Sequence, residues 1–331
     1  MADPASQPCP WHREAWAALA QQPRHAHAYL LCGITGIGKR RFANAFAARL
    51  LCLSPAHGMA CGSCRSCALR QAGSHPDYLE VAPEEEGKAI RVDAIRQLSE
   101  FLAQTAQQGG RKVILLQPAE AMNLNAANAL LKSLEEPAGD AHLLLVSDQP
   151  SRLLPTIRSR CLVQALPSPG PREAADWLAE QLPELEDVQR AALLNMAEGA
   201  PLMALNLHRQ DALGWRALVV DQIKGLLKNQ TSPSQVADKW SAVPLELLVD
   251  WFCGFTMDLL KLRLGAVQEP ASQDMDKVLG YMAQRVELPE LLTWQSWLVE
   301  HRGKILGKAN LNRALFIESL LIQWKQMLER R

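Results

Sequence analysis

The sequence predicts an α/β domain of the P-loop type with a parallel sheet, followed by helical domains. A glycine-rich turn at residues 33–39 stands between a short apolar run and an apolar-periodic helix. This is the strand–loop–helix order that a phosphate-binding loop requires. Up to about residue 165, runs typical of buried strands alternate with helical stretches, which favours a doubly wound parallel sheet. Beyond about residue 209 the periodicity is helical throughout.

The glycine-rich turn has the spacing GxxxxGK and is preceded by a strand expected at residues 28–32. Glycines in such a loop let backbone N–H groups surround phosphate oxygens, and the N-terminus of the following helix adds positive potential. We therefore predict that any bound nucleotide is held by Gly33, Gly36, Gly38 and Lys39.

At three positions near this loop, the chain lacks the side chains that P-loop ATPases use to hydrolyse ATP. Arg40 stands where the motif has a serine or threonine that binds Mg²⁺. The strand at residues 112–116 ends in Gln117 and Pro118, where a P-loop ATPase has an aspartate that supports Mg²⁺ and a glutamate that prepares the attacking water. Arg40 either takes the place of the metal with its own charge or blocks the site. A third possibility is that the loop binds no phosphate and serves only the integrity of the fold. ATP binding is therefore doubtful, and we do not expect this chain to hydrolyse ATP.

The composition argues against several classes of protein. The 331 residues include 35 Lys and Arg and 35 Asp and Glu, so the net charge is zero, unlike that of a protein that coats DNA through bulk charge. No apolar run approaches the roughly 20 residues of a membrane span, so we expect no membrane association. The N-terminal residues lack the cationic start and apolar stretch of a secretion signal. We expect a cytoplasmic protein with reduced thiols.

Four of the eight cysteines are clustered with the spacing C-x8-C-x2-C-x2-C: Cys52, Cys61, Cys64 and Cys67. Four thiolates at this spacing can surround one ion, and zinc favours four sulfur ligands in a tetrahedron. Because four sulfurs close the coordination shell and leave no place for water, we predict a structural zinc. The alternatives are four incidental cysteines or a disulfide pair, which a reducing compartment disfavours.

A linker rich in proline at residues 167–171 predicts the first domain boundary. The first domain then covers residues 1–166, with the cysteine module at residues 52–67 as an insertion. Short helical stretches in residues 167–208 predict a small three-helix lid domain. Residues 209–331 contain longer helical stretches separated by polar breaks, which predict an all-α C-terminal domain suited to packing with neighbouring subunits.

Several short motifs follow one another along the first domain. The most specific are the run NALLKSLEEP at residues 128–137 and the triplet Ser159-Arg160-Cys161. The others are the loop at residues 33–39, the four-cysteine insertion, His75-Pro76-Asp77 and Ile90-Arg91-Val92-Asp93. Together they resemble the bacterial sliding-clamp loaders, which are AAA+ ATPase assemblies of the DNA polymerase III holoenzyme. The resemblance covers about residues 10–208, and the C-terminal domain matches in length and helical character only.

The resemblance implies an AAA+ fold and a role as a non-hydrolysing component of the DNA polymerase III holoenzyme. Motor subunits of that family keep Ser or Thr after the loop lysine, Asp-Glu at the second site and an arginine in a Gly-Ser-Leu-Arg stretch of the second domain. This chain has Arg40, Gln117 and Pro118, and it has Leu202 in the place of that arginine. By the same resemblance, Arg160 of the intact Ser-Arg-Cys triplet is an arginine finger that acts in trans on the ATP site of a neighbouring motor subunit.

The resemblance also implies the partners and the overall activity. The partners are the motor subunits (gamma or tau) and the delta subunit in a hetero-oligomer whose collar includes the C-terminal domain. Through that complex the chain meets the sliding clamp and primer–template DNA, and it assists the ATP-dependent loading of the clamp in replication. Glu135 and Glu136 close a helix at an end where negative charge is unfavourable, and the sequence predicts no role for them.

Two other functions fit parts of the sequence. One is an autonomous P-loop ATPase with an atypical metal site. The other is a zinc-ribbon adaptor for nucleic acid, although the neutral net charge and the lack of interleaved aromatic residues near the four cysteines argue against it.

Overall fold

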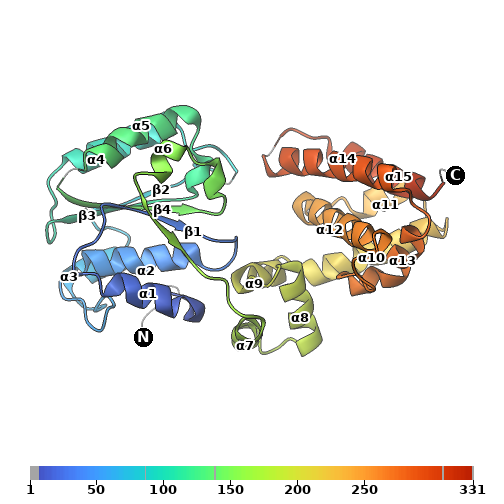
Figure 1. The fold of residues 1–331 in the computed structure, drawn as a ribbon, viewed down its shortest axis with the longest axis horizontal. Coiled ribbons are helices and arrows are strands. Elements are labelled where there is room, and N and C mark those ends of the chain that lie inside the picture. The colour runs from blue at the N-terminus through green and yellow to red at the C-terminus, as the bar shows by residue number, and fades with distance from the viewer. Residues whose placement is uncertain (1–6, 86, 138, 308, 330–331) are drawn as a thin grey trace. The chain divides into compact units, whose positions relative to one another are not determined.

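The computed structural model of the chain describes residues 7–85, 87–137, 139–307 and 309–329, so the first six residues of the predicted domain 1–166 lie outside the described part. The chain divides into two compact units, Met1–Asn206 and Leu207–Arg331 (Figure 1).

The first unit is built on a sheet of five parallel strands in the order β2–β3–β4–β1–β5. The strands are β1 (Ala28–Cys32), β2 (Tyr78–Val81), β3 (Arg111–Leu116), β4 (Asp140–Ser147) and β5 (Leu162–Ala165). Parallel neighbours require long crossover connections, and helices supply them here. The predicted parallel α/β architecture is confirmed.

The central strands β1, β3 and β4 are buried along almost their whole length, as expected for parallel strands between two layers of helices. Because successive side chains point to opposite faces of a sheet, Leu30 belongs to one hydrophobic core, whereas Tyr29 and Leu31 belong to the other. The strand β5 lies at the edge of the sheet and is mostly exposed.

One face of the sheet is covered by α4 (Val92–Ala103), α5 (Leu124–Glu135) and the short α6 (Pro155–Arg158) (Figure 1). Their inward residues recur at helical spacing and are buried against the sheet. These residues are Ile95, Leu98 and Leu102 of α4, Ala126, Leu130 and Leu134 of α5, and Ile157 of α6.

The other face is covered by α1 (Arg13–Ala20) and α2 (Lys39–Leu51). The ring of Phe46 in α2 meets the rings of Trp16, His25 and Tyr29 edge-on, with centroid distances between 5.3 and 6.2 Å. Edge-to-face aromatic pairs stabilise a core beyond the area they bury. This packing fixes α2 on the sheet, and it therefore fixes the loop that leads into α2.

Two short helices were not predicted from the sequence. One is α3 (Arg65–Gln71), which lies within the cysteine module, and the other is α11 (Pro233–Lys239) in the second unit. The side chain of Cys64 accepts a hydrogen bond from the backbone of Cys67 and so caps α3. The N-cap of α11 is Ser232.

Helices α7 (Pro171–Gln181) and α8 (Asp187–Met196) follow the proline-rich linker, and α9 (Pro201–Arg209) carries the chain across the boundary between the units. The ring of Trp177 in α7 meets the ring of Trp11 edge-on at 5.6 Å. The three helices expected in residues 167–208 are therefore present, and α9 ends one residue beyond this segment.

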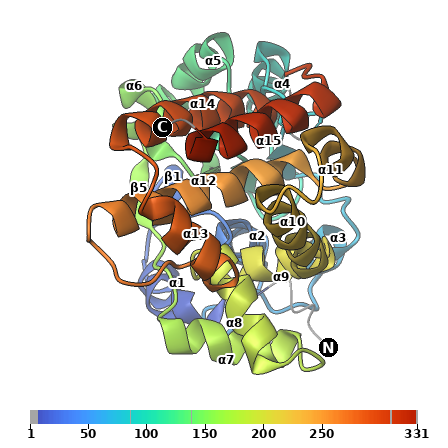
Figure 2. The ribbon, with the colours of Figure 1, turned by 90° about the vertical axis from the view of Figure 1, so that its right-hand side faces the viewer.

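The second unit is helical, as predicted, and Figure 2 shows its helices. They are α10 (Ala212–Leu227), α11, α12 (Leu245–Arg263), α13 (Asp276–Ala283), α14 (Leu288–Leu306) and α15 (Arg313–Glu329). Phe252 of α12 lies at the centre of an aromatic core and contacts Trp240, Phe255, Trp294 and Trp324. This unit therefore has a core of its own.

No helix in the described ranges combines the length and the apolar character that crossing a membrane requires.

Candidate functional site

The carboxyl ends of four neighbouring strands carry the side chains of the candidate nucleotide site. Lys39 follows β1 through the glycine-rich loop, Gln117 follows β3 and Asp148 follows β4, while Glu80 lies near the end of β2. Ligand sites of open parallel sheets lie at this edge. The sheet thus brings together residues that are far apart in the sequence.

The ammonium group of Lys39 contacts polar groups of its own chain. Its side chain is only 4% exposed, and Nζ lies 2.5 Å from Oδ1 of Asp148. Nζ also donates to the carbonyl oxygens of Gly33, at 2.8 Å, and Ile34, at 2.5 Å. An ammonium group has three N–H donors. Two of them are directed to the loop carbonyls, and the positive charge is paired with the carboxylate of Asp148. In this arrangement the positive charge of Lys39 is already paired within the chain.

Asp148 is itself held in place from two directions. Its second carboxylate oxygen accepts a hydrogen bond from Oγ1 of Thr35 at 2.9 Å. Its backbone N–H donates to Oε1 of Glu120 at 2.8 Å. Asp148 therefore ties the end of β4 to the glycine-rich loop, a role that sequence analysis did not predict.

The loop glycines allow a close approach by other parts of the first unit. Gly36 and Gly38 have φ values of +80° and +95°, which favour glycine. A Cβ atom on Gly36 would lie 2.5 Å from Cβ of Met203, and the backbone N–H of Leu202 donates to the Gly36 carbonyl at 3.0 Å. A Cβ atom on Gly38 would lie 2.6 Å from Sγ of Cys9. The N-terminal end of α9 thus packs directly on the loop.

Two residues of the N-terminal segment also contact the loop region. The indole Nε1 of Trp11 donates to the carbonyl of Ile37 at 2.9 Å. His12 is fully buried, and burial lowers its pKa to about 4, with the nearby Lys39 acting in the same direction. His12 is therefore neutral near pH 7 and adds no positive charge beside Lys39.

Arg40 and Gln117, which stand where P-loop ATPases have groups that bind or support Mg²⁺, both contact the carboxylate of Glu80. Nη2 of Arg40 lies 3.1 Å from Oε1 of Glu80, and Nε2 of Gln117 donates to the same oxygen at 2.6 Å. The phenol of Tyr78 donates to the other carboxylate oxygen at 3.4 Å. The guanidinium and the amide thus converge on one carboxylate.

Arg160 lies on the loop between α6 and β5, away from these residues in the sequence. Its Nη2 lies 2.7 Å from Oε1 of Glu135, the last residue of α5, and the Arg160 side chain is 35% exposed. Its Nη1 donates to the carbonyl of Thr156 at 3.0 Å and approaches Oγ of Ser159 at 3.5 Å. The guanidinium is therefore ordered and accessible at the surface.

The strand that follows Arg160 presents apolar side chains to solvent. Leu162 and Val163 of β5 are 47% and 53% exposed, and within the described residues β5 pairs with β1 alone. An open edge strand with exposed apolar residues is a surface on which another protein chain can pack.

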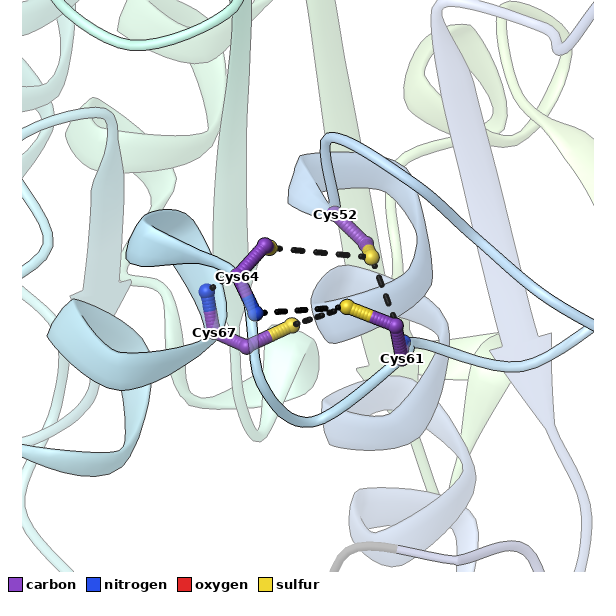
Figure 3. Close-up of side chains that lie close together, drawn as sticks. All are labelled: Cys52, Cys61, Cys64 and Cys67. Atoms are coloured by element: carbon purple, nitrogen blue, oxygen red, sulfur yellow. Dashed lines mark hydrogen bonds between the residues drawn. The ribbon is translucent and has the colours of Figure 1, made fainter.

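The four predicted metal ligands come together at the end of α2 and the start of α3 (Figure 3). Their sulfur atoms all lie within 4.8 Å of one another, with Cys52 3.9 Å from Cys64 and Cys61 4.0 Å from Cys67. These distances are too long for disulfides. They are close to the ~3.8 Å between sulfurs bound at 2.3 Å around a tetrahedral metal. The cluster can therefore hold a metal ion.

The surroundings of the cluster stabilise negative charge on some of its sulfurs. Hydrogen bonds from the backbone N–H groups of Ser63 and Cys64 lower the pKa of Cys61 to about 6. Burial raises the pKa of Cys67 to about 12. A metal ion favours the thiolate form of every ligand, so it would offset the cost of ionising the buried sulfur.

A buried hydrogen-bond chain supports the cysteine module. Ser66 donates to the carbonyl of Leu51 at 2.7 Å, and its hydroxyl lies 2.8 Å from Nε2 of His75. The backbone N–H of Asp77 donates to Nδ1 of His75, so the ring is neutral and Nε2 carries its proton. The His75-Pro76-Asp77 motif therefore helps to hold α3 against α2.

The chain is similar to known replication proteins along most of its length. Residues 12–169 match the family described as DNA polymerase III, delta subunit, and residues 210–326 match the C-terminal family of that description. The DNA polymerase III subunit delta′ of Pseudomonas aeruginosa is 51% identical and covers 96% of this chain and 97% of its own. The subunit delta′ of Escherichia coli K12 is 32% identical, with 97% and 96% covered. A gamma subunit-related protein of Thermotoga maritima is 19% identical, with a TM-score of 0.46 over 96% of this chain and 99% of its own.

The contact between Lys39 and Asp148 predicts a measurable energetic coupling. We expect Asp148→Ala to lower the free energy of unfolding by about 1–3 kcal/mol, because a buried ammonium group loses its carboxylate. The loss should be much smaller in a Lys39→Met background, which has no buried charge to leave unpaired. Urea unfolding of the four proteins of this cycle measures the coupling, and hydrogen exchange in α2 localises it.

Asp176→Ala is the control, because it removes an exposed carboxylate that pairs only with the exposed Arg172 in α7 among the ion pairs of the described residues. This change should cost less than about 1 kcal/mol. A coupling energy near zero between Lys39 and Asp148 would show that the carboxylate does not hold the ammonium group.

Proposed function

Because this chain belongs to the family of DNA polymerase III delta′ subunits, we propose that it is a non-hydrolysing subunit of a sliding-clamp loader. In this proposal the complex loads the clamp onto primed DNA at the expense of ATP that is bound by other subunits. The chain contributes a stable scaffold and one guanidinium group to a neighbouring ATP site.

The contacts of Lys39 are the main support for the proposal that this chain neither binds nor hydrolyses ATP. In a P-loop that binds a nucleotide, the lysine reaches the phosphates. Here its ammonium group pairs with Asp148 and donates to the carbonyl oxygens of Gly33 and Ile34. A nucleotide would have to break a buried ion pair before it gained the lysine. The residues Gly33, Gly36, Gly38 and Lys39 are therefore proposed as a degenerate nucleotide site with a structural role.

The contacts of Arg40 support the proposal that this site does not bind Mg²⁺. Of the two roles that the sequence leaves open, we favour the one in which Arg40 supplies a positive charge in place of the metal, because its guanidinium pairs with Glu80. Gln117 donates to the same carboxylate, whereas an aspartate at this position would repel it. Neither Arg40 nor Gln117 offers an anionic oxygen ligand to a hard cation.

Arg160 is proposed as an arginine finger that acts in trans. Its guanidinium is accessible, and it precedes the exposed edge strand β5, where Leu162 and Val163 offer apolar surface to another chain. A guanidinium that enters a neighbouring ATP site stabilises the charge on the transferred phosphoryl group, an effect worth roughly 10³–10⁵ in rate.

The proposed partners follow from the family. They are the gamma or tau motor subunits and the delta subunit, together with the sliding clamp and primer–template DNA that the complex brings together. The exposed apolar residues Leu292, Val299 and Leu306 of α14 recur every seven residues, which suits lateral packing against neighbouring helices. We propose that this face contributes to a collar of C-terminal domains.

The three-part division of the chain, 1–166, 167–208 and 209–331, is retained as a proposal. Its support is that the two matched stretches, residues 12–169 and 210–326, leave the segment of α7 to α9 between them. In this division residues 167–208 form a lid that is held on the loop by the contacts of Leu202 and Met203 with Gly36.

The metal of the cysteine cluster is proposed to be zinc with a structural role. Cys52, Cys61, Cys64 and Cys67 supply four sulfurs at distances that suit a tetrahedral ion, and zinc favours this ligand set. Four protein ligands leave no coordination site for a substrate or water, so the ion would order the loop between α2 and α3.

An autonomous P-loop ATPase remains the alternative, but no contact among the described residues favours it over the proposal. Appreciable Mg²⁺-dependent ATP turnover by the isolated chain, abolished by Lys39→Ala, would favour this alternative.

The arginine-finger proposal predicts that one ATP site of the assembled complex loses its fast hydrolysis when Arg160 is removed. We expect that a complex reconstituted with Arg160→Ala loses the fast hydrolysis of the ATP bound next to this chain, because the charge on that phosphoryl group is no longer stabilised. A single-turnover assay with clamp and primed DNA measures the amplitude and the rate of the fast phase.

Arg158→Ala is the control, since it removes an exposed arginine two residues away at the end of α6. It should leave the fast phase intact. An unchanged fast phase with Arg160→Ala, in a complex that still assembles, would remove Arg160 from the ATP site.

The zinc proposal predicts about one zinc ion per chain in freshly purified, reduced protein. We expect Cys64→Ser to lose the metal and to speed hydrogen exchange in α3, because this helix begins at the cluster. Cys253→Ser changes a cysteine outside the cluster and should keep the metal. Inductively coupled plasma mass spectrometry measures the content, and a value near zero in the unaltered chain argues against the proposal.

A further inference from the structure

Glu135 occupies an unfavourable position in α5. It is the last residue of that helix, where the partial negative charge of the helix end repels a carboxylate. Its neighbour Glu136 adds a second negative charge. A carboxylate at such a position needs a compensating contact, and the structure supplies one for Glu135.

The compensating contact is the guanidinium of Arg160. Oε1 of Glu135 lies 2.7 Å from Nη2 of Arg160, a close ion pair. On its other side, Nη1 of Arg160 donates to the carbonyl of Thr156 at 3.0 Å. The guanidinium is therefore held between the end of α5 and the end of α6, from two separate elements of the fold.

We propose that Glu135 is a positioning residue that holds Arg160 in place for the neighbouring ATP site. The inference rests on the proposed function of Arg160 as an arginine finger in trans. Glu135 does not itself touch the nucleotide. It acts by ordering the guanidinium before the neighbouring subunit docks.

The donor count of Arg160 leaves room for this role. A guanidinium group has five N–H donors. In the described part of the chain, Nη1 donates to Thr156 and Ser159, and Nη2 forms an ion pair with Glu135 at 2.7 Å. The Nε–H is not used by these contacts, so it can donate to an anionic phosphoryl oxygen while Glu135 stays bound.

Ordering the side chain in advance has a physical benefit. An arginine has many rotamers, and fixing them costs conformational entropy when the complex forms. Contacts that fix the rotamer in the free chain remove this cost from the catalytic step. The ion pair is half exposed, with 50% of the Glu135 side chain accessible, so its effect should be modest.

The test compares Glu135 variants in the reconstituted complex with clamp and primed DNA. We expect Glu135→Gln to slow the single-turnover hydrolysis next to this chain by about two- to fivefold, the range of a partly exposed ion pair. The affinity for ATP, complex assembly and the melting temperature of the chain should not change. Glu135→Asp keeps the carboxylate and should recover part of the rate.

Glu136→Gln is the matched control, because it removes the same charge one residue along the chain and Glu136 is exposed. It should have no effect on the rate. In an Arg160→Ala background, Glu135→Gln should also have no further effect, because there is no guanidinium left to position.

The outcomes separate the two proposals. If Arg160→Ala leaves hydrolysis unchanged, the finger itself is rejected, and the role of Glu135 falls with it. If Arg160→Ala slows hydrolysis but Glu135→Gln leaves the rate unchanged or raises it, the finger stands and the positioning role is rejected. Equal effects of Glu135→Gln with and without Arg160 also reject positioning, since they indicate a separate structural role.

Discussion

The burial of the Lys39 ammonium group is the constraint on which the candidate nucleotide site depends. A buried charge is tolerated only where partners replace the lost hydration. In many P-loop proteins a bound phosphate is one of the partners of the lysine. Here Asp148 and two loop carbonyls are its partners. The site is thus electrostatically complete without a ligand. The loop glycines leave the space in which α9 and the N-terminal segment pack against the loop.

A scaffold that is complete without nucleotide suits a subunit that does not cycle between nucleotide states. The loop contacts α9 through Gly36 and the N-terminal segment through Ile37, and Trp11 connects that segment to α7. The surfaces that we propose for partners lie elsewhere, at the edge of the sheet next to Arg160 and on the exposed face of α14.

Sequence patterns predicted the elements of the fold because the apolar periodicity of each element is local. The parallel sheet, the helices on its faces and the four-cysteine cluster all have the expected form. The helix α11 carried a signal that could have identified it, since Ser232 and Gln235 form a capping box around Pro233. The helix α3 did not, because its cap is the sulfur of Cys64.

The contacts that define the site were not accessible from sequence. Asp148 meets Lys39 because β4 lies beside β1, and Glu135 meets Arg160 because α5 and α6 share one face of the sheet. Strand order is a property of the whole fold, so ion pairs between distant segments follow from topology rather than from local pattern. The unfavourable charge at the end of α5 was the one local hint that a partner existed.

The central claim is that the nucleotide site is closed by the chain itself, and equilibrium binding of ATP to the isolated, full-length protein tests it most directly. Isothermal titration with and without Mg²⁺ should show no saturable binding up to about 1 mM, an affinity weaker than roughly −4 kcal/mol. Saturable micromolar binding that requires Lys39 and tightens with Mg²⁺ would contradict the account.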